Sequence, residues 1–201
     1  IDNSSTDLTV EKIKNLAKKD KNLKLIVNTR NFGAIRSPYF GVIQSTGDAC
    51  ILIASDFQVP PILINDFIKS WENGFKIVLA KKESTDGNNL IFYAKKKYYS
   101  FMQKISDVPI LENCTGFGLF DKSIIDILKE IDDPYPYFRG LLTEIGYPIS
   151  IIPYNELNRT YGESSYNFFI LYDYFMLGTT QHSKLPIRLI TMFGFLISLS
   201  S

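Results

Sequence analysis

One apolar stretch of the sequence ends in a single carboxylate. Residues 49–54, ACILIA, form a continuous apolar run, and Asp56 follows it, ahead of Gln58 and the pair Pro60–Pro61. Such a run is typical of a strand that is covered on both faces. Ligands of open α/β sheets bind beyond the carboxyl ends of the strands, so we expect Asp56 at a binding site. The alternative is that its carboxylate caps a helix starting near Pro60.

A second carboxylate, Asp2, follows Ile1, at the expected end of a strand that begins before this sequence. The nearby segment NFGAIRSPYFG has too few glycines, at the wrong spacing, for a Rossmann or P-loop motif. Asp2 could instead belong to an Asx turn before Ser5.

Strand-like and helix-like segments alternate along the chain and must position these carboxylates. Residues 9–20 carry apolar residues at helical spacing, and residues 61–74 begin with Pro and end with Gly, as helices often do. Residues 33–48 are predicted as a helix interrupted near Pro38. The alternation predicts an α/β protein with a mostly parallel sheet. Its strands are expected at residues 23–29, 49–55, 76–80, 116–121 and 149–154.

Composition excludes several classes of protein. The chain has 22 Lys and Arg against 21 Asp and Glu, which gives no reason to expect a nucleic-acid partner. Two cysteines without paired spacing argue against a disulfide framework or a Cys-based zinc site. A single histidine, His182, excludes a His-rich metal site.

The C-terminal part of the chain differs from the rest. Residues 161–183 are predicted as an amphipathic juxtamembrane segment with an apolar aromatic band. Residues 189–199 are almost all apolar, but a full membrane span needs about 20 such residues. We therefore interpret residues 184–201 as the start of a transmembrane helix, with Lys184 and Arg188 on its cytoplasmic flank. A core helix of a soluble protein is the alternative.

Six motifs occur in a fixed order between Ile1 and Tyr166: IDNSSTD, RNFG, GDACILIASDFQVPP, TGFGLFD, YFRGLLTEIGYPISIIPY and NRTYGESSY. Together they resemble family-two glycosyltransferases of the polyprenyl-phosphate type. These are relatives of dolichol-phosphate mannose synthase and of bacterial undecaprenyl-phosphate glycosyltransferases. The resemblance implies a GT-A nucleotide-sugar-binding fold over residues 1–160, whose first strand would lie before Ile1, and membrane helices after it. It also implies a metal ion, Mg²⁺ or Mn²⁺.

The resemblance also implies roles for individual residues. Asp56 matches the second aspartate of an Asp-x-Asp metal motif, and Gln58 belongs to the segment after it. Asp2 matches a residue that meets the nucleotide base. The substrate-binding residues further include Arg30 in RNFG, Arg139 near the acceptor phosphate and Arg159 at the donor diphosphate, where Arg159 is also catalytic.

This sequence departs from the family pattern at several motif positions. Ala54 stands where the first aspartate of Asp-x-Asp is usual, and Val59 replaces the aspartate before the prolines. Phe117 stands in TGFGLF where many members have an aspartate that is often given a catalytic role, and Ser165 replaces a common lysine. A phosphate monoester is already an anion at neutral pH and needs no general base, so a lipid-phosphate acceptor would tolerate the loss at Phe117.

The function implied is a metal-dependent, inverting transfer of sugar from a UDP- or GDP-sugar to a polyprenyl phosphate. It would take place at the membrane, with the catalytic domain in the cytoplasm. A second copy of the chain is a further partner that the sequence permits. Two alternatives stay open. One is a soluble GT-A transferase acting on a saccharide or protein hydroxyl, with Glu112, Asp121 or Glu144 as its base. The other is a non-catalytic nucleotide-sugar-binding domain.

Overall fold

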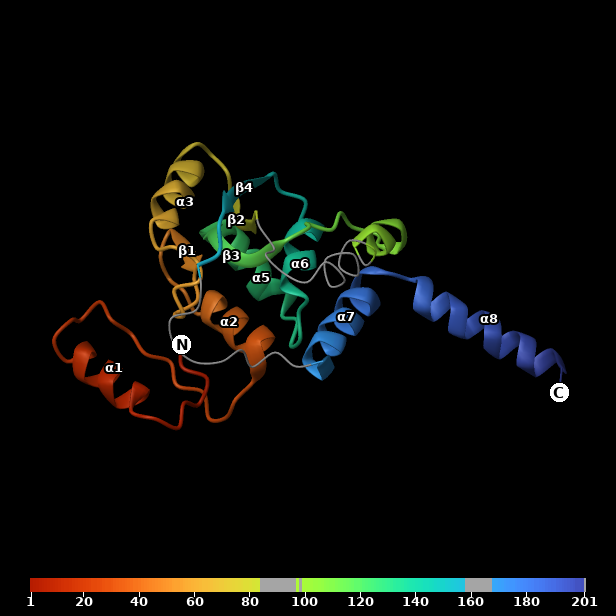
Figure 1. The fold of residues 1–201 in the computed structure, drawn as a ribbon, viewed down its shortest axis with the longest axis horizontal. Helices are drawn as coiled ribbons and strands as arrows, with labels where there is room; N and C mark the ends of the chain where they lie inside the picture. The colour runs from red at the N-terminus through yellow and green to blue at the C-terminus, as the bar shows by residue number, and fades with distance from the viewer. Residues whose placement is uncertain (84–96, 98, 158–167, 201) are drawn as a thin grey trace.

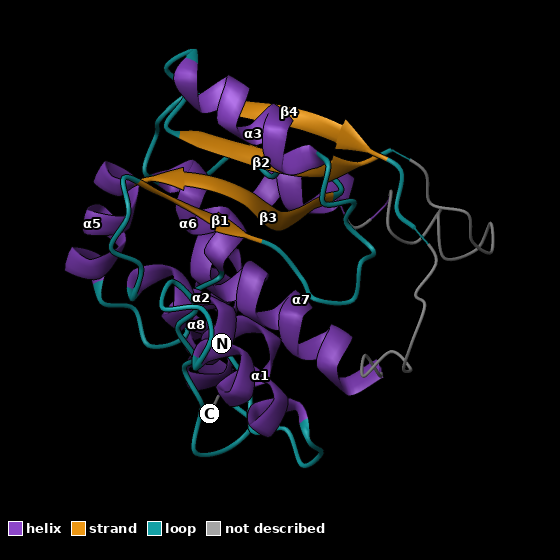
Figure 2. Ribbon diagram, turned by 90° about the vertical axis from the view of Figure 1, so that its left-hand side faces the viewer, coloured by secondary structure: helices purple, strands orange, loops and turns teal. Residues whose placement is uncertain are grey.

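The computed structural model describes residues 1–83, 97, 99–157 and 168–200, and a four-stranded sheet lies at its centre (Figures 1 and 2). The strands are β1 (Ala49–Leu52), β2 (Ile77–Lys82), β3 (Cys114–Asp121) and β4 (Ile149–Tyr154). Their order across the sheet is β1-β3-β2-β4. Four of the five expected strands are therefore present. In the fifth, residues 23–29, the structure shows only an isolated parallel bridge between Val27 and Asp2.

The prediction of a mostly parallel sheet needs correction, because the sheet is mixed. Strands β2 and β4 are parallel, but β3 lies between β1 and β2 and is antiparallel to both. The amide of Lys82, at the end of β2, donates to the carbonyl oxygen of Asn113 at 3.1 Å. The chain thus re-enters the sheet at the edge where it left, and a strand that does so must run in the opposite direction.

Helices cover both faces of the sheet (Figure 2). On one face, α2 (Gly33–Ile43), α5 (Lys122–Ile131) and α6 (Phe138–Glu144) bury a cluster that includes Phe120, Ile125 and Leu142. On the other face, α3 (Leu63–Glu72) contributes Leu63 and Phe67 to a second cluster. Burial of these apolar side chains is the main force that holds the three layers together.

The apolar sequence IVLA predicts a buried strand, and strand β2 confirms that prediction. Its residues Ile77 to Ala80 are fully buried, and they alternate between the two clusters. Beside it, Gly118 of β3 is required by close packing, since a Cβ there would lie 1.9 Å from the carbonyl oxygen of Val78.

The structure tests three of the predicted helices. The expected interruption near Pro38 is wrong, because α2 continues through Pro38 and ends at Ile43. Helix α3 does begin just after Pro60–Pro61, where the carbonyl oxygens of these prolines accept the amides of Leu63 and Ile64 at 3.1 Å. The N-terminal helix α1 spans Thr9–Ala17, as its periodicity predicts.

Two helices follow at the C-terminal end: α7 (Phe168–His182) and α8 (Leu185–Ser200). Helix α8 projects away from the remainder of the chain, and none of its residues is buried (Figure 1). In the described part of the chain, no helix on its own has the length and hydropathy of a membrane span. One pair of helices has the length and hydropathy of a membrane span when the two are taken together, and the pair is bent by 81°: Phe169–His182 and Leu185–Ser200.

Candidate active site

The loop after β1 carries Asp56. One of its carboxylate oxygens accepts the backbone amide of Gln58 at 3.2 Å, and Phe57 between them has a φ of +57°. Left-handed conformations of bulky residues are unfavourable and concentrate at functional sites. Helix α3 has Ile62 at its N-cap and no side-chain cap hydrogen bond. Asp56 therefore does not cap α3, contrary to the alternative interpretation of this residue.

Asp56 lies near the end of β4. The hydroxyl of Tyr154, the last residue of that strand, is buried, and burial is the largest influence that raises its pKa. A hydrogen bond with Thr115 acts in the opposite direction, while the negative charges of Glu156 and Asp56 raise the pKa further. The loops after β1 and β4 are also joined directly, because the amide of Leu157 donates to the carbonyl oxygen of Gln58 at 3.0 Å.

The end of β2 adds a charged pair to the same edge of the sheet. The ammonium group of Lys82 forms an ion pair with the carboxylate of Glu156. The amide of Glu83 donates to the carbonyl oxygen of Tyr154 at 2.9 Å. Lys82, Tyr154 and Glu156 were not predicted as site residues, although each lies at or just beyond the carboxyl end of a predicted strand.

Arg139 reaches this edge from the first turn of α6. Its Nη1 donates to the carbonyl oxygen of Cys114 at 2.8 Å, at the start of β3. Burial raises the pKa of the Cys114 thiol, and the positive charges of Lys81 and Arg139 oppose that rise. Lys81 of β2 pairs with Cys114 of β3, and Lys82 pairs with Tyr154 of β4. The Arg139 contact at Cys114 and the Tyr154 hydroxyl, whose pKa Asp56 raises, therefore lie on either side of the end of β2.

Asp2 and Arg30 belong to a second group of contacts near the N-terminus. The carboxylate of Asp2 accepts the amide of Ser5 at 2.9 Å and its hydroxyl at 2.5 Å. The hydroxyl contact is the largest cause of the lowered pKa of Asp2. Asp2 thus makes the local turn contacts of the alternative interpretation, and its role toward a nucleotide base stays a prediction. Arg30 lies with its guanidinium 4.2 Å from the ring centre of Phe32.

Asn3 connects Asp2 to the loop that carries Arg30. Its side-chain oxygen accepts the amide of Phe32 at 2.9 Å and the side-chain amide of Asn28 at 3.1 Å. Its own NH₂ group donates to the side-chain oxygen of Asn31 at 2.7 Å. This network holds residues 28–33 against the turn that contains Asp2.

The three candidate general bases lie in different places. Asp121 pairs with Ala49, at the edge of the sheet opposite Asp56, and caps α5 through the amide of Ser123 at 3.0 Å. Burial would raise its pKa, but hydrogen bonds from Ser123, Trp71 and Lys76 outweigh burial and hold the pKa well below its usual range. Asp121 is therefore a structural cap. The carboxylate of Glu112 accepts a hydrogen bond from the side-chain amide of Gln103 at 3.1 Å. A carboxylate oxygen of Glu144 lies 3.8 Å from Nδ1 of His182.

The protein supplies few ligands for a metal ion at the Asp56 edge. Among residues 1–83, 97, 99–157 and 168–200, no three His, Cys, Asp or Glu side chains form a group that could hold one. Mg²⁺ does not require such a cage, since it commonly binds one or two carboxylates together with substrate phosphates and water. The Asp56 carboxylate fits that mode of binding. Ala54 supplies no second carboxylate from the same loop.

Arg159 and Ser165 lie outside the described residues. A cavity of about 460 Å³ lies elsewhere, between α5, α6 and the end of α7, and Ile131, Leu141, Glu144 and His182 are among its lining residues. Apart from Glu144, a candidate base of the alternative function, the cavity lining includes none of the predicted site residues, so we place the candidate active site at the Asp56 edge and not in this cavity.

The structure thus combines an α/β sheet with a carboxylate, Asp56, and an arginine, Arg139, at one end of its strands. Residues 1–128 match the model of glycosyl transferase family 2, and the chain belongs to that family. Membership implies the GT-A fold.

Curated relatives match along the whole chain. It is 31% identical over 98% of its length to the bactoprenol glucosyl transferase of Shigella phage SfX, and covers 65% of that protein. It is 29% identical over its full length to the putative glycosyltransferase CsbB of Bacillus subtilis, and covers 61% of it. An uncharacterised glycosyltransferase of Synechocystis is 26% identical over the full chain, which covers 64% of it. The resemblance to the polyprenyl-phosphate type is thereby confirmed. The chain spans somewhat less than two thirds of these relatives.

Proposed function

We propose that this chain is the catalytic part of an enzyme that transfers a sugar from a nucleotide-diphosphate sugar to a polyprenyl phosphate. The observation that carries the proposal is that Asp56, in the loop after β1, and the Arg139 contact at the start of β3 lie at the same end of the sheet. The chain is also similar to bactoprenol glucosyl transferases over nearly its whole length. The donor nucleotide is UDP or GDP. The catalytic domain faces the cytoplasm, and α7 and α8 hold it at the membrane.

In this proposal each group at the site has a distinct task. Asp56, together with the donor diphosphate, would hold Mg²⁺ or Mn²⁺, which supplies positive charge to the leaving diphosphate. Arg139 binds the acceptor phosphate, and its hydrogen bond to the Cys114 carbonyl fixes one arm of the guanidinium. Asp2 and Arg30 bind the nucleotide, and Arg159 contacts the diphosphate. Gln58 holds the backbone of the Asp56 loop against the segment after β4.

The acceptor's own charge explains why Phe117 is tolerated. Phe117 packs in the apolar cluster beneath α3 and supplies no base. A phosphate oxygen that is already anionic attacks the anomeric carbon, the bond to the diphosphate breaks, and the configuration inverts. No proton has to be removed in this step, so neither Asp121 nor Glu144 is needed.

The test uses the full-length protein with a panel of nucleotide sugars and undecaprenyl phosphate, and it measures release of nucleoside diphosphate. Undecaprenol, which has the same chain without phosphate, is the matched acceptor control. We expect release that depends on the lipid phosphate and not on the alcohol. Equal release with both acceptors would show that the enzyme uses a hydroxyl. Donor binding without any release would indicate a non-catalytic binding domain.

A further inference from the structure

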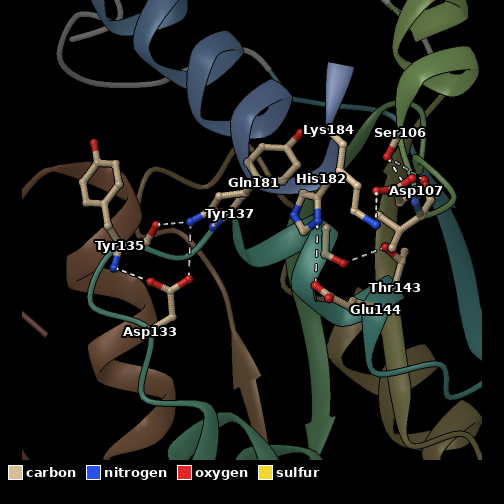
Figure 3. Close-up of polar contacts among 12 residues, drawn as sticks. Ser106, Asp107, Asp133, Tyr135, Tyr137, Thr143, Glu144, Gln181, His182 and Lys184 are labelled. Carbon is tan, nitrogen blue, oxygen red and sulfur yellow. Dashed lines mark hydrogen bonds and ion pairs between the residues drawn. The ribbon is translucent and has the colours of Figure 1, made fainter. Parts of the chain in front are cut away.

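The C-terminal end of α7 is attached to the segment that leads into α6 (Figure 3). The side-chain oxygen of Gln181 accepts the backbone amide of Tyr137 at 2.6 Å. Its NH₂ group donates to the carbonyl oxygen of Tyr135 at 2.9 Å and to the carboxylate of Asp133 at 3.3 Å. One side chain of α7 therefore fixes the backbone immediately before α6.

Two glycines allow α7 and this segment to approach closely. A Cβ on Gly178 of α7 would lie 3.1 Å from the ring of Tyr137. A Cβ on Gly140 of α6 would lie 2.0 Å from Nε2 of His182, which is buried and has no hydrogen-bond partner. The imidazole of His182 thus occupies the space that any side chain at position 140 would need.

Tyr137 makes contact with both α7 and Arg139. Tyr137 is 8% exposed, and its ring lies 5.5 Å from the imidazole of His182, centre to centre. The guanidinium of Arg139 lies 5.3 Å from the same ring, within the range of a cation–π interaction. The guanidinium also donates to the Cys114 carbonyl at the candidate site. A continuous series of contacts therefore runs from α7 through Tyr137 to Arg139.

We propose that Tyr137 is a positioning residue, which orients the Arg139 guanidinium toward the acceptor phosphate only while the end of α7 is seated against it. The proposal rests on the proposed function, since it assumes that Arg139 binds that phosphate. Arg139 is held from two directions, by the ring of Tyr137 and by the carbonyl oxygen of Cys114. Helix α7 leads directly into the exposed apolar helix α8, so attachment of α8 to a membrane and orientation of Arg139 are mechanically connected.

The first test is a double-mutant cycle with Tyr137→Leu and Arg139→Ala, in which KM for undecaprenyl phosphate and KM for the donor are measured separately. Tyr137→Leu removes the aromatic ring, and loss of one cation–π contact is expected to raise the acceptor KM roughly tenfold. The donor KM stays unchanged. In the Arg139→Ala background the same substitution has little further effect, because the group that it positions is absent. Tyr137→Phe keeps the ring and behaves like the wild type.

A second pair of variants tests the seating of α7. Gly140→Ala puts a methyl group where the His182 imidazole lies, and we expect it to raise the acceptor KM. Adding His182→Ala to the same chain removes the clash and lowers the acceptor KM again. Independent effects of Tyr137→Leu and Arg139→Ala, or an equal rise in both KM values, would overturn the proposal.

A measurement without turnover separates this proposal from the proposed function. The Nε–H resonance of Arg139, identified by its loss in Arg139→Lys, reports on the ring beside it. We expect the resonance to shift in Tyr137→Leu and to stay in place in Tyr137→Phe. An unshifted resonance in Tyr137→Leu would refute the positioning role. Absence of transfer by the wild-type protein, together with a shifted resonance, would refute only the proposed function.

Discussion

Leu157 and Gln58 are joined through their backbones: the amide of Leu157 donates to the carbonyl oxygen of Gln58 at 3.0 Å. Gln58 belongs to the Asp56 loop, and Leu157 directly precedes the segment that contains Arg159. The Asp56 loop is thus joined to the residue immediately before the segment in which Arg159 occurs in the sequence. We therefore expect substitutions of Asp56 and Arg159 both to affect transfer from the donor.

Asp56→Asn keeps the shape of the side chain and removes its charge. If Asp56 is the carboxylate that holds the metal ion, turnover should fall by at least ~10²-fold, which is on the order of the loss of one electrostatic catalytic element. Asp66→Asn, an equivalent change at an exposed position of α3, is the matched control and should have no effect. Near-normal turnover of Asp56→Asn at saturating Mn²⁺ would contradict the assignment.

Arg159→Lys keeps a positive charge and loses the planar fork that binds phosphate through two hydrogen bonds. We expect a clear fall in kcat for Arg159→Lys and a larger fall for Arg159→Ala. Donor affinity should change less, because the charge on the leaving diphosphate builds up in the transition state. Steady-state kinetics with varied donor separates the two effects. A normal kcat with weaker lipid binding would place Arg159 at the acceptor instead.

Asp121→Asn should reduce stability and spare catalysis. Asp121 is 7% exposed, and its carboxylate accepts hydrogen bonds from the indole N–H of Trp71 at 2.8 Å and from the backbone amide of Ser123 at 3.0 Å. Hydrogen bonds to a buried charged group contribute about 1.5–3 kcal/mol each to stability. The ion pair with Lys76 adds less, since Lys76 is 44% exposed. We expect Tm to fall by several degrees while kcat of the folded protein is unchanged.

Asp126→Asn, the same substitution at an exposed position of α5, is the matched control for Asp121→Asn and should leave Tm unchanged. Because the pKa of Asp121 is lowered in the folded protein, its contribution is present above the ordinary value of 3.8 and is lost as pH falls below it. The stability difference between wild type and Asp121→Asn should therefore shrink in acid. A loss of kcat at full folding would restore Asp121 as a candidate base.

His182 should make the protein less stable in mild acid. Burial is the main cause of its lowered pKa, and the negative charge of Glu144 only partly opposes it. The unfolded chain therefore binds a proton more readily than the folded protein, and stability falls as pH drops below the ordinary value of 6.5. The negative charges of Glu144 and Asp133 both act to raise the pKa of the imidazole. His182→Gln should show a smaller loss of stability between neutral pH and pH 5 in thermal unfolding, and an equal loss would contradict the prediction.

Removal of α8 should reduce binding to membranes. Its apolar side chains are exposed along the whole helix, and the strength of interfacial binding scales with the apolar area that is buried. A chain that ends at Lys184 should bind liposomes at least ~10-fold more weakly than the chain to Ser201 in a sedimentation assay. Equal binding would mean that α8 packs against protein in the complete molecule.

The buried strands and the position of Asp56 were predictable from the sequence for a local physical reason. A strand covered on both faces has to be apolar throughout, so the sequence IVLA predicts the buried strand β2 correctly. The equally apolar ACILIA was also expected to be covered on both faces, but it contains the edge strand β1, whose residues are only half-buried. The residue that follows such a run lies at a strand end wherever the strand is placed in the sheet. Pro60–Pro61 likewise marked the start of α3 through its fixed φ and missing amide hydrogens.

The direction of β3 and the surroundings of Arg139 were not predictable in this way. Apolar residues in Cys114–Asp121 indicate a strand but do not say at which edge the chain enters the sheet. The edge at which β3 enters the sheet is seen only in the structure, in the hydrogen bond from the amide of Lys82 to the carbonyl oxygen of Asn113. Tyr137 and Gln181 are far apart in the chain, and neither residue type signals the other.

The sequence by itself determined that the chain forms an α/β layer structure, that residues 77–80 form a buried strand, and that Asp56 follows a strand, because each of these follows from local periodicity and composition. Only the tertiary structure decided that Asp121 is a cap at the far end of the sheet and that Asp56 raises the pKa of Tyr154 beside the Lys82–Glu156 ion pair. It also decided that α7 seats Tyr137 beside Arg139. Those relationships arise from packing between distant segments, where close approach and burial select the partners.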